Sequence, residues 1–170
     1  MDARYNEEQI RNHLSELYWE IINGLRIQSN SDFLVATLIV EIQPLLLETS
    51  GYSITDDTIH IFLGGWDADG IQKLIDDSKL PSKNLIKSMR DYPGWLINLL
   101  EEISHSIQNK LEFNSDQSEV ARGFHESYEV HFEGAGHDEK FFASLLILAK
   151  TLEIQSPKFV NIVAGLPYNE

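Results

Sequence analysis

Residues 6–28, NEEQIRNHLSELYWEIINGLRIQ, carry the pattern that decides the fold. Apolar side chains recur there at intervals of three and four residues, which places them on one face of a helix. The members of this stripe are Ile10, Leu14, Leu17, Tyr18, Ile21, Ile22 and Leu25. Asn6 precedes the stripe as a candidate N-cap, and Gln9 follows three residues later, as in a capping box. The stretch therefore predicts a long amphipathic helix packed on a hydrophobic core.

Two later segments repeat this helical pattern. Residues 93–111 begin with Pro93, which suits the first turn of a helix. Their apolar stripe consists of Leu96, Leu99, Leu100, Ile103, Ile107 and Leu111. Residues 138–153 follow the turn GAGHD and are apolar at Phe141, Phe142, Leu145, Leu146, Leu148 and Leu152. We also expect short helices over 67–78 and from Pro81 or Ser82 onward, and an apolar tail from Pro157 that docks on the body.

The segment from Asp32 to Thr49 is apolar almost without interruption. Its length and apolar content favour a central helix, capped by Ser31 and bent near Pro44. Its β-branched residues leave a strand as the alternative; they are Val35, Thr37, Ile39, Val40 and Ile42.

Strand patterns occur at residues 58–63 and 128–133. The first is rich in β-branched and aromatic residues and ends at Gly64-Gly65. The second alternates, with Tyr128, Val130 and Phe132 on one face. We expect these two strands to pair in a small two- to three-stranded sheet against a helical body. The predicted class is α+β, predominantly helical, in one domain spanning residues 1–170.

Composition limits the function classes. The chain has 170 residues and no cysteine, which excludes disulfides, thiolate catalysis and zinc sites that need sulfur. Its polar N-terminus has no signal-like apolar core, and no stretch is long enough to span a membrane, so a cytoplasmic protein is expected. The net charge of -14 opposes direct contact with nucleic acid and favours a basic partner or simply high solubility.

The acidic excess is concentrated in residues 112–139. Eight acidic residues stand there against one basic residue, Arg122, a net charge of -7. We predict that this region binds a basic partner through charge pairing and electrostatic steering. The predicted partner-binding residues are Asp116, Glu119, Glu126, Glu129, His131, Glu133, Asp138 and Glu139. The alternative is a charged strand edge that merely resists aggregation.

No catalytic residue, cofactor or metal site is predicted. Histidines recur at positions 125, 131 and 137, near Glu133 and Asp138, but without the compact spacing of a known zinc motif. Surface or hydrogen-bonded histidines are therefore expected. Trp66 and Trp95 lie beside loops, where they either cap the core, which we favour, or anchor an interface.

In general character, being small, acidic and cysteine-free, the chain resembles the immunity proteins that bacteria make against nuclease toxins. The resemblance is one of class and transfers no site residue. It implies an inhibitor that binds and covers a basic nuclease-type toxin or another nucleic-acid-handling protein, or more widely a nucleic-acid mimic. The alternatives are a structural subunit of a larger assembly and a hydrolase with a site around His131, Glu133 and His137.

Overall fold

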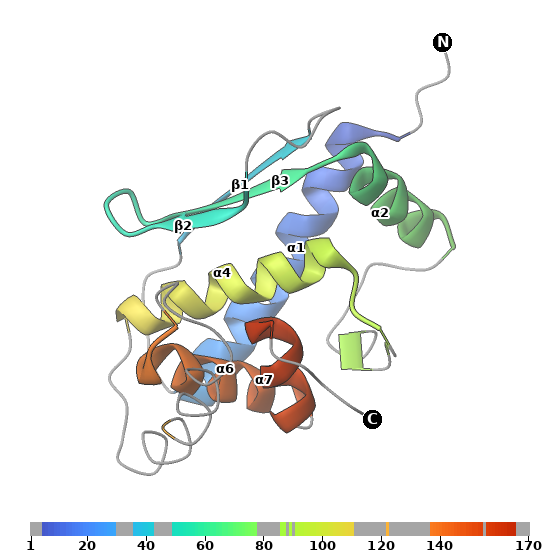
Figure 1. The fold of residues 1–170 in the computed structure, drawn as a ribbon. Coiled ribbons are helices and arrows are strands. Elements are labelled where there is room, and N and C mark those ends of the chain that lie inside the picture. The colour runs from blue at the N-terminus through green and yellow to red at the C-terminus, as the bar shows by residue number, and fades with distance from the viewer. Residues whose placement is uncertain are drawn as a thin grey trace.

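The computed structural model describes residues 5–29, 36–42, 49–77, 86, 87, 89, 91–110, 122, 137–154 and 156–165. Over these residues the chain is a predominantly helical α+β fold with a small mixed sheet, as predicted (Figure 1). The helices are α1 (Glu7–Ser29), α2 (Gly65–Asp77), α4 (Gly94–Lys110), α6 (Glu139–Leu152) and α7 (Ser156–Ala164). The strands are β1 (Thr37–Ile42), β2 (Gly51–Ser53) and β3 (Thr58–Leu63).

Helix α1 confirms the prediction for residues 6–28, including its N-cap. The Asn6 side chain accepts a hydrogen bond from the Gln9 amide at 3.1 Å. The second half of the capping box is supplied from another helix, because the Asn6 amide donates to Gln72 of α2 at 3.0 Å. The Gln72 side chain in turn donates to Gln9 at 3.1 Å. The start of α1 is thereby joined to α2 by paired polar contacts.

The sheet has the strand order β1-β3-β2. Strand β1 runs parallel to β3 with Val40 opposite Ile61, and β2 runs antiparallel with Tyr52 opposite Ile59. The alternate residues Ile59, Ile61 and Leu63 are fully buried, so this face of β3 packs on the core. The predicted partner strand, 128–133, lies outside the described residues, and its pairing with β3 stays a prediction.

The prediction of a helix from Asp32 to Thr49 was wrong over residues 37–42, which form β1. Four of its six residues are β-branched, and such side chains pack well on a pleated surface but lose rotamer freedom in a helix. Pairing along the whole of β3 then settles the conformation. Residues 32–35 and 43–48 lie outside the described residues.

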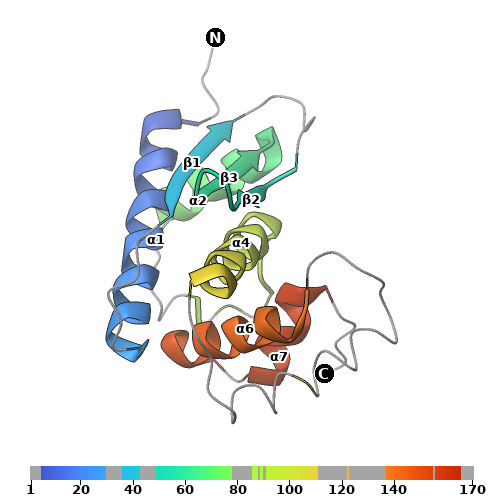
Figure 2. The ribbon, with the colours of Figure 1, turned by 90° about the vertical axis from the view of Figure 1, so that its left-hand side faces the viewer.

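Helix α4 lies between the sheet and the α6–α7 pair (Figures 1 and 2). The stripe predicted for residues 93–111 is buried at every described position: Leu96, Leu99, Leu100, Ile103 and Ile107. Buried residues of α1, β1, β3, α2, α4, α6 and α7 belong to one hydrophobic cluster. Helix α4 therefore contributes a rigid central element from which polar side chains can be presented.

The apolar tail docks on the body, as expected, and does so as a helix. Phe159, Val160 and Val163 of α7 are buried. Helix α6 is terminated by its C-cap residue Glu153, which has a left-handed backbone (φ 58°). None of the described helices combines the length and apolarity needed to cross a membrane.

Candidate functional site

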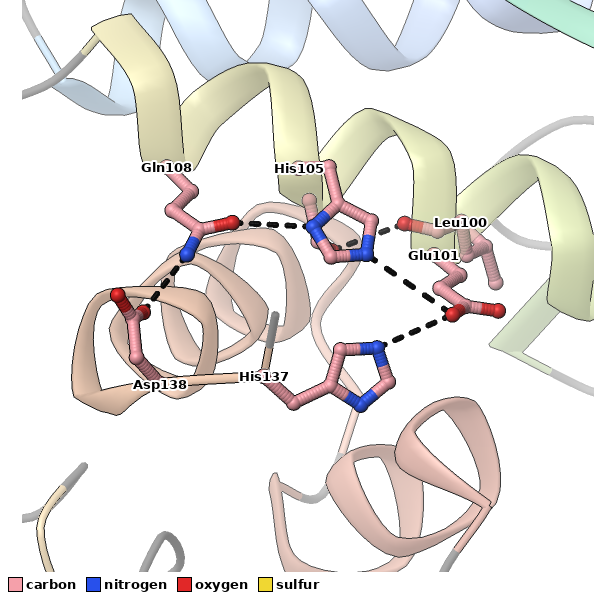
Figure 3. Close-up of polar contacts among 7 residues, drawn as sticks. Leu100, Glu101, His105, Gln108, His137 and Asp138 are labelled. Carbon is pink, nitrogen blue, oxygen red and sulfur yellow. Dashed lines mark hydrogen bonds and ion pairs between the residues drawn. The ribbon is translucent and has the colours of Figure 1, made fainter. Parts of the chain in front are cut away.

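A cluster of titratable side chains joins the middle of α4 to the start of α6 (Figure 3). Glu101 and His105 lie one helical turn apart on α4 and therefore share a face. His137 lies just before α6 and reaches the same point. Its Nε2 is 3.1 Å from Glu101 Oε1, and the Nε2 of His105 is 3.9 Å from that oxygen. Two imidazoles thus converge on one carboxylate oxygen.

A chain of hydrogen bonds orients His105. Asp138 accepts from the Phe141 amide at 2.9 Å as the N-cap of α6, and from Gln108 Nε2 at 2.7 Å. Because the Gln108 amide nitrogen faces Asp138, its oxygen faces His105 Nδ1 at 3.0 Å, so this nitrogen must carry the proton. Burial lowers the pKa of His105 below its ordinary value. The ring is therefore neutral at pH 7, with the lone pair of Nε2 directed toward Glu101.

The ring of Phe141 holds both imidazoles in place. It stacks on His137 with centroids 3.9 Å apart and an interplanar angle of 3°. It also lies 4.6 Å from the His105 ring. Because Phe141 is fully buried, this surface is rigid, and neither imidazole is free to rotate far without losing contact.

A pocket of ≈ 470 Å³ opens beside the cluster. Its described lining residues are Tyr52, Ile54, Glu102, His105, Gln108, Asn109, Asp138 and Lys140. The hydroxyl of Tyr52, one of these lining residues, donates to Asp57 at 2.6 Å, and Lys110 pairs with the same carboxylate at 2.7 Å. The cluster therefore borders a space large enough for a small molecule.

Glu102 is the most perturbed group in this pocket. It is only 6% exposed, and the described residues offer its carboxyl no hydrogen bond or ion pair. Burial, followed by the charge of Glu101, raises the pKa of Glu102 to about 8. At neutral pH its carboxyl is protonated, so it can donate a hydrogen bond or a proton to a molecule in the pocket.

Of the predicted partner-binding residues, Asp116, Glu119, Glu126, Glu129, His131 and Glu133 lie outside the described residues. Asp138 caps α6 and holds Gln108, and Glu139 forms an ion pair with Arg122 at 3.5 Å. Whether these residues form one binding face stays a prediction. His137 is hydrogen-bonded, as one of the two expectations had it, but it is buried.

Sequence reasoning missed Glu101, Glu102 and His105. A signal for two of them was present, since a Glu and a His four positions apart on a predicted helix share a face. His137, the remaining member of the cluster with Glu101 and His105, lies 36 positions beyond Glu101, and no spacing rule connects the two. Only the packing of α6 against α4 brings them together.

Comparison with known proteins found no matching family model, no matching curated protein and no matching solved structure. The function must therefore be argued from the chain's own charge and geometry.

Proposed function

We propose that the protein is an acidic binding protein that neutralises a basic, nuclease-type toxin or another nucleic-acid-handling protein by covering its functional surface. The observation that carries the proposal is the net charge of -14 on 170 residues. A surface of one sign accelerates encounter with a partner of the opposite sign and disfavours partners of the same sign.

The acidic excess is not confined to residues 112–139. Helices α1 and α2, which pack together, carry eight acidic residues against three basic ones, a difference of -5. The acidic residues are Glu7, Glu8, Glu16, Glu20, Asp67, Asp69, Asp76 and Asp77. These helices therefore add acidic side chains that can pair with a basic partner.

An exposed aromatic residue supports a protein partner. Trp66, in the first turn of α2, is 94% exposed, whereas Trp95 is 4% exposed. The interpretation that the tryptophans cap the core therefore holds for Trp95 and was wrong for Trp66. Tryptophan is among the residues most often found at the energetic centre of protein interfaces. Asp67 follows Trp66 directly and Asp69 comes two residues later, so an apolar anchor and negative charge lie together.

The test begins with capture of the partner from the native host and its purification. Association rates are then measured across a salt series for the wild type, a Glu129→Lys/Glu133→Lys variant and an Asp76→Lys/Asp77→Lys variant. The proposal expects a basic partner, association that slows as salt rises, and slower association in at least one reversal variant. Trp66→Ala should instead accelerate dissociation, with the exposed Ile27→Ala as its control. An acidic partner, or binding that ignores salt and both reversals, would refute the proposal.

A second candidate function, a hydrolase, is favoured by one specific arrangement. His137 meets Glu101 and His105 beside a pocket that contains the protonated Glu102. A neutral imidazole and a protonated carboxyl are a suitable base and acid for hydrolysis. The remaining residues of this hypothesis, His131 and Glu133, lie outside the described residues. Assays on model carboxylic and phosphoric esters, comparing wild type with Glu102→Gln and with the exposed control Glu16→Gln, test it. Absence of turnover, or equal turnover in all three proteins, would count against it.

A further inference from the structure

We propose that Glu101, His105 and His137 form a binding site for a divalent transition metal, with zinc as the expected ion. Each residue offers one ligand atom, and the three atoms lie within 4.8 Å of one another. The inference does not rest on the proposed function, because its test requires neither a partner nor a substrate.

The distances are close to those of a bound set. Zinc binds imidazole nitrogen and carboxylate oxygen at roughly 2.0–2.2 Å in tetrahedral geometry, which places ligand atoms roughly 3.3–3.5 Å apart. Glu101 Oε1 is 3.1 Å from His137 Nε2 and 3.9 Å from His105 Nε2. Side-chain rotations that move each atom by no more than about 1 Å would complete the geometry. The three residues supply three ligands and leave the fourth position for water or a small molecule.

The tautomer of His105 leaves two acceptor atoms facing each other at this point. Gln108 accepts the proton of Nδ1, so Nε2 presents a lone pair toward a carboxylate oxygen that also has only lone pairs. At 3.9 Å no hydrogen bond forms between them. A cation between the two atoms would be coordinated by both and would remove their repulsion.

Surrounding contacts resemble the supporting shell of a metal centre. Histidine ligands commonly donate their second ring nitrogen to a carboxylate or carbonyl, which fixes tautomer and orientation. Gln108 provides that acceptor, and Asp138 holds Gln108 from the other side. Phe141 packs against both imidazoles. The ligands are therefore oriented before any ion arrives, so little conformational entropy is lost on binding.

Ligand type and access select the ion. Two imidazole nitrogens and one carboxylate favour zinc and similar transition metals over magnesium and calcium, which prefer oxygen ligands. Side-chain exposure rises from 6% at His137 through 19% at His105 to 27% at Glu101. The ion would thus be bound by a buried His137 on one side, and its free coordination position would face solvent on the side of Glu101. The earlier expectation of no metal site rested on spacing along residues 125–139, whereas two of these ligands come from α4.

The test uses tag-free protein, treated with a chelator and dialysed, then titrated with zinc chloride by isothermal calorimetry. We expect one saturable site per chain in the wild type, and at least about tenfold weaker binding in Glu101→Gln and in His137→Gln. Glu101→Gln keeps an acceptor for His137 while removing the charged ligand, so folding is preserved. His60→Gln is the matched control, because His60 also lies 3.2 Å from a glutamate, Glu41, and the described part of the chain places no third ligand beside them.

Three further measurements separate a metal site from a structural contact. Cobalt(II) in place of zinc should give the intense visible absorption of a tetrahedral site, and Gln108→Ala should weaken zinc binding by about 10–100-fold through loss of ligand orientation. Magnesium chloride should produce no saturable heat. The proposal is overturned if the wild type shows no saturable zinc binding. It is equally overturned if Glu101→Gln and His137→Gln, shown by circular dichroism to be folded, bind zinc as tightly as His60→Gln.

Discussion

Replacing Glu102 by glutamine should make the protein more stable at neutral pH but not in mild acid. An unfolded glutamic acid ionises near its ordinary pKa of 4.5, whereas burial raises the pKa of Glu102 in the folded chain to about 8. Between these values the folded state holds a proton that the unfolded state has released. The free energy of unfolding therefore falls as pH rises through this window. Below it both states are protonated, and above it the loss is complete.

The stability that Glu102 removes follows from the pH range between its unfolded pKa of 4.5 and its folded pKa of about 8. Each pH unit inside it removes up to about 1.4 kcal/mol from the free energy of unfolding. From about pH 5 to about pH 7, Glu102 should therefore cost the wild type about 3 kcal/mol. The amide of Glu102→Gln resembles the protonated carboxyl in shape and does not ionise, so the variant should lack this dependence. The side chain is 6% exposed, so solvent screening is weak.

The assay is urea unfolding followed by circular dichroism at several values between about pH 5 and about pH 8. The stability difference between Glu102→Gln and wild type should be near zero at the acidic end and reach about 3 kcal/mol at neutral pH. Glu16→Gln is the control, because Glu16 is exposed on α1 and its replacement leaves Glu102 in place. Its pH profile should match the wild type. If Glu102→Gln and wild type change in parallel with pH, the carboxyl is not buried as described.

Four further changes test the packing and the helix cap by urea unfolding. Gly24→Ala should destabilise the α1–α6 contact by about 1–3 kcal/mol, because its Cβ would lie 2.8 Å from Thr151 Cγ2. Gly70→Ala should stabilise α2 by up to about 1 kcal/mol, because the added Cβ would have no atom within 4 Å. A Gly24→Ala variant more stable than Gly70→Ala would contradict the packing. Phe159→Ala should cost about 3–5 kcal/mol, and a loss below about 1 kcal/mol would mean that α7 is not docked. Asp138→Ala should cost about 1 kcal/mol or more through the lost N-cap of α6, and an unchanged midpoint would rule that cap out.

The long helices were predictable because their signal is local. In residues 6–28 and 93–111 the apolar residues repeat with the period of a helix, and this period alone states which face must be buried. The structure places α1 and α4 within about two residues of those ranges, the ordinary uncertainty of helix ends.

Strand β1 could not be predicted from its local sequence alone. Its apolar run is compatible with a buried helix and with a buried strand, and the sequence offers no period to choose between them. The choice is made by hydrogen bonds to β3, which begins 21 positions after β1 in the paired register. A long-range pairing of this kind overrides local preference.

The candidate site likewise has features that the sequence determined and features that only the tertiary structure decided. The sequence by itself determined the helix that carries Glu101 and His105 and the helix that begins just after His137. It also determined the charge on which the proposed binding function rests. It did not determine that His137 meets Glu101, since the packing of α6 on α4 brings the two side chains to 3.1 Å. Nor did it determine the pKa of Glu102, because desolvation depends on what surrounds a carboxyl in space. Periodicity acts between neighbours along the chain, whereas ligand geometry and burial arise between residues that only the folded chain brings together.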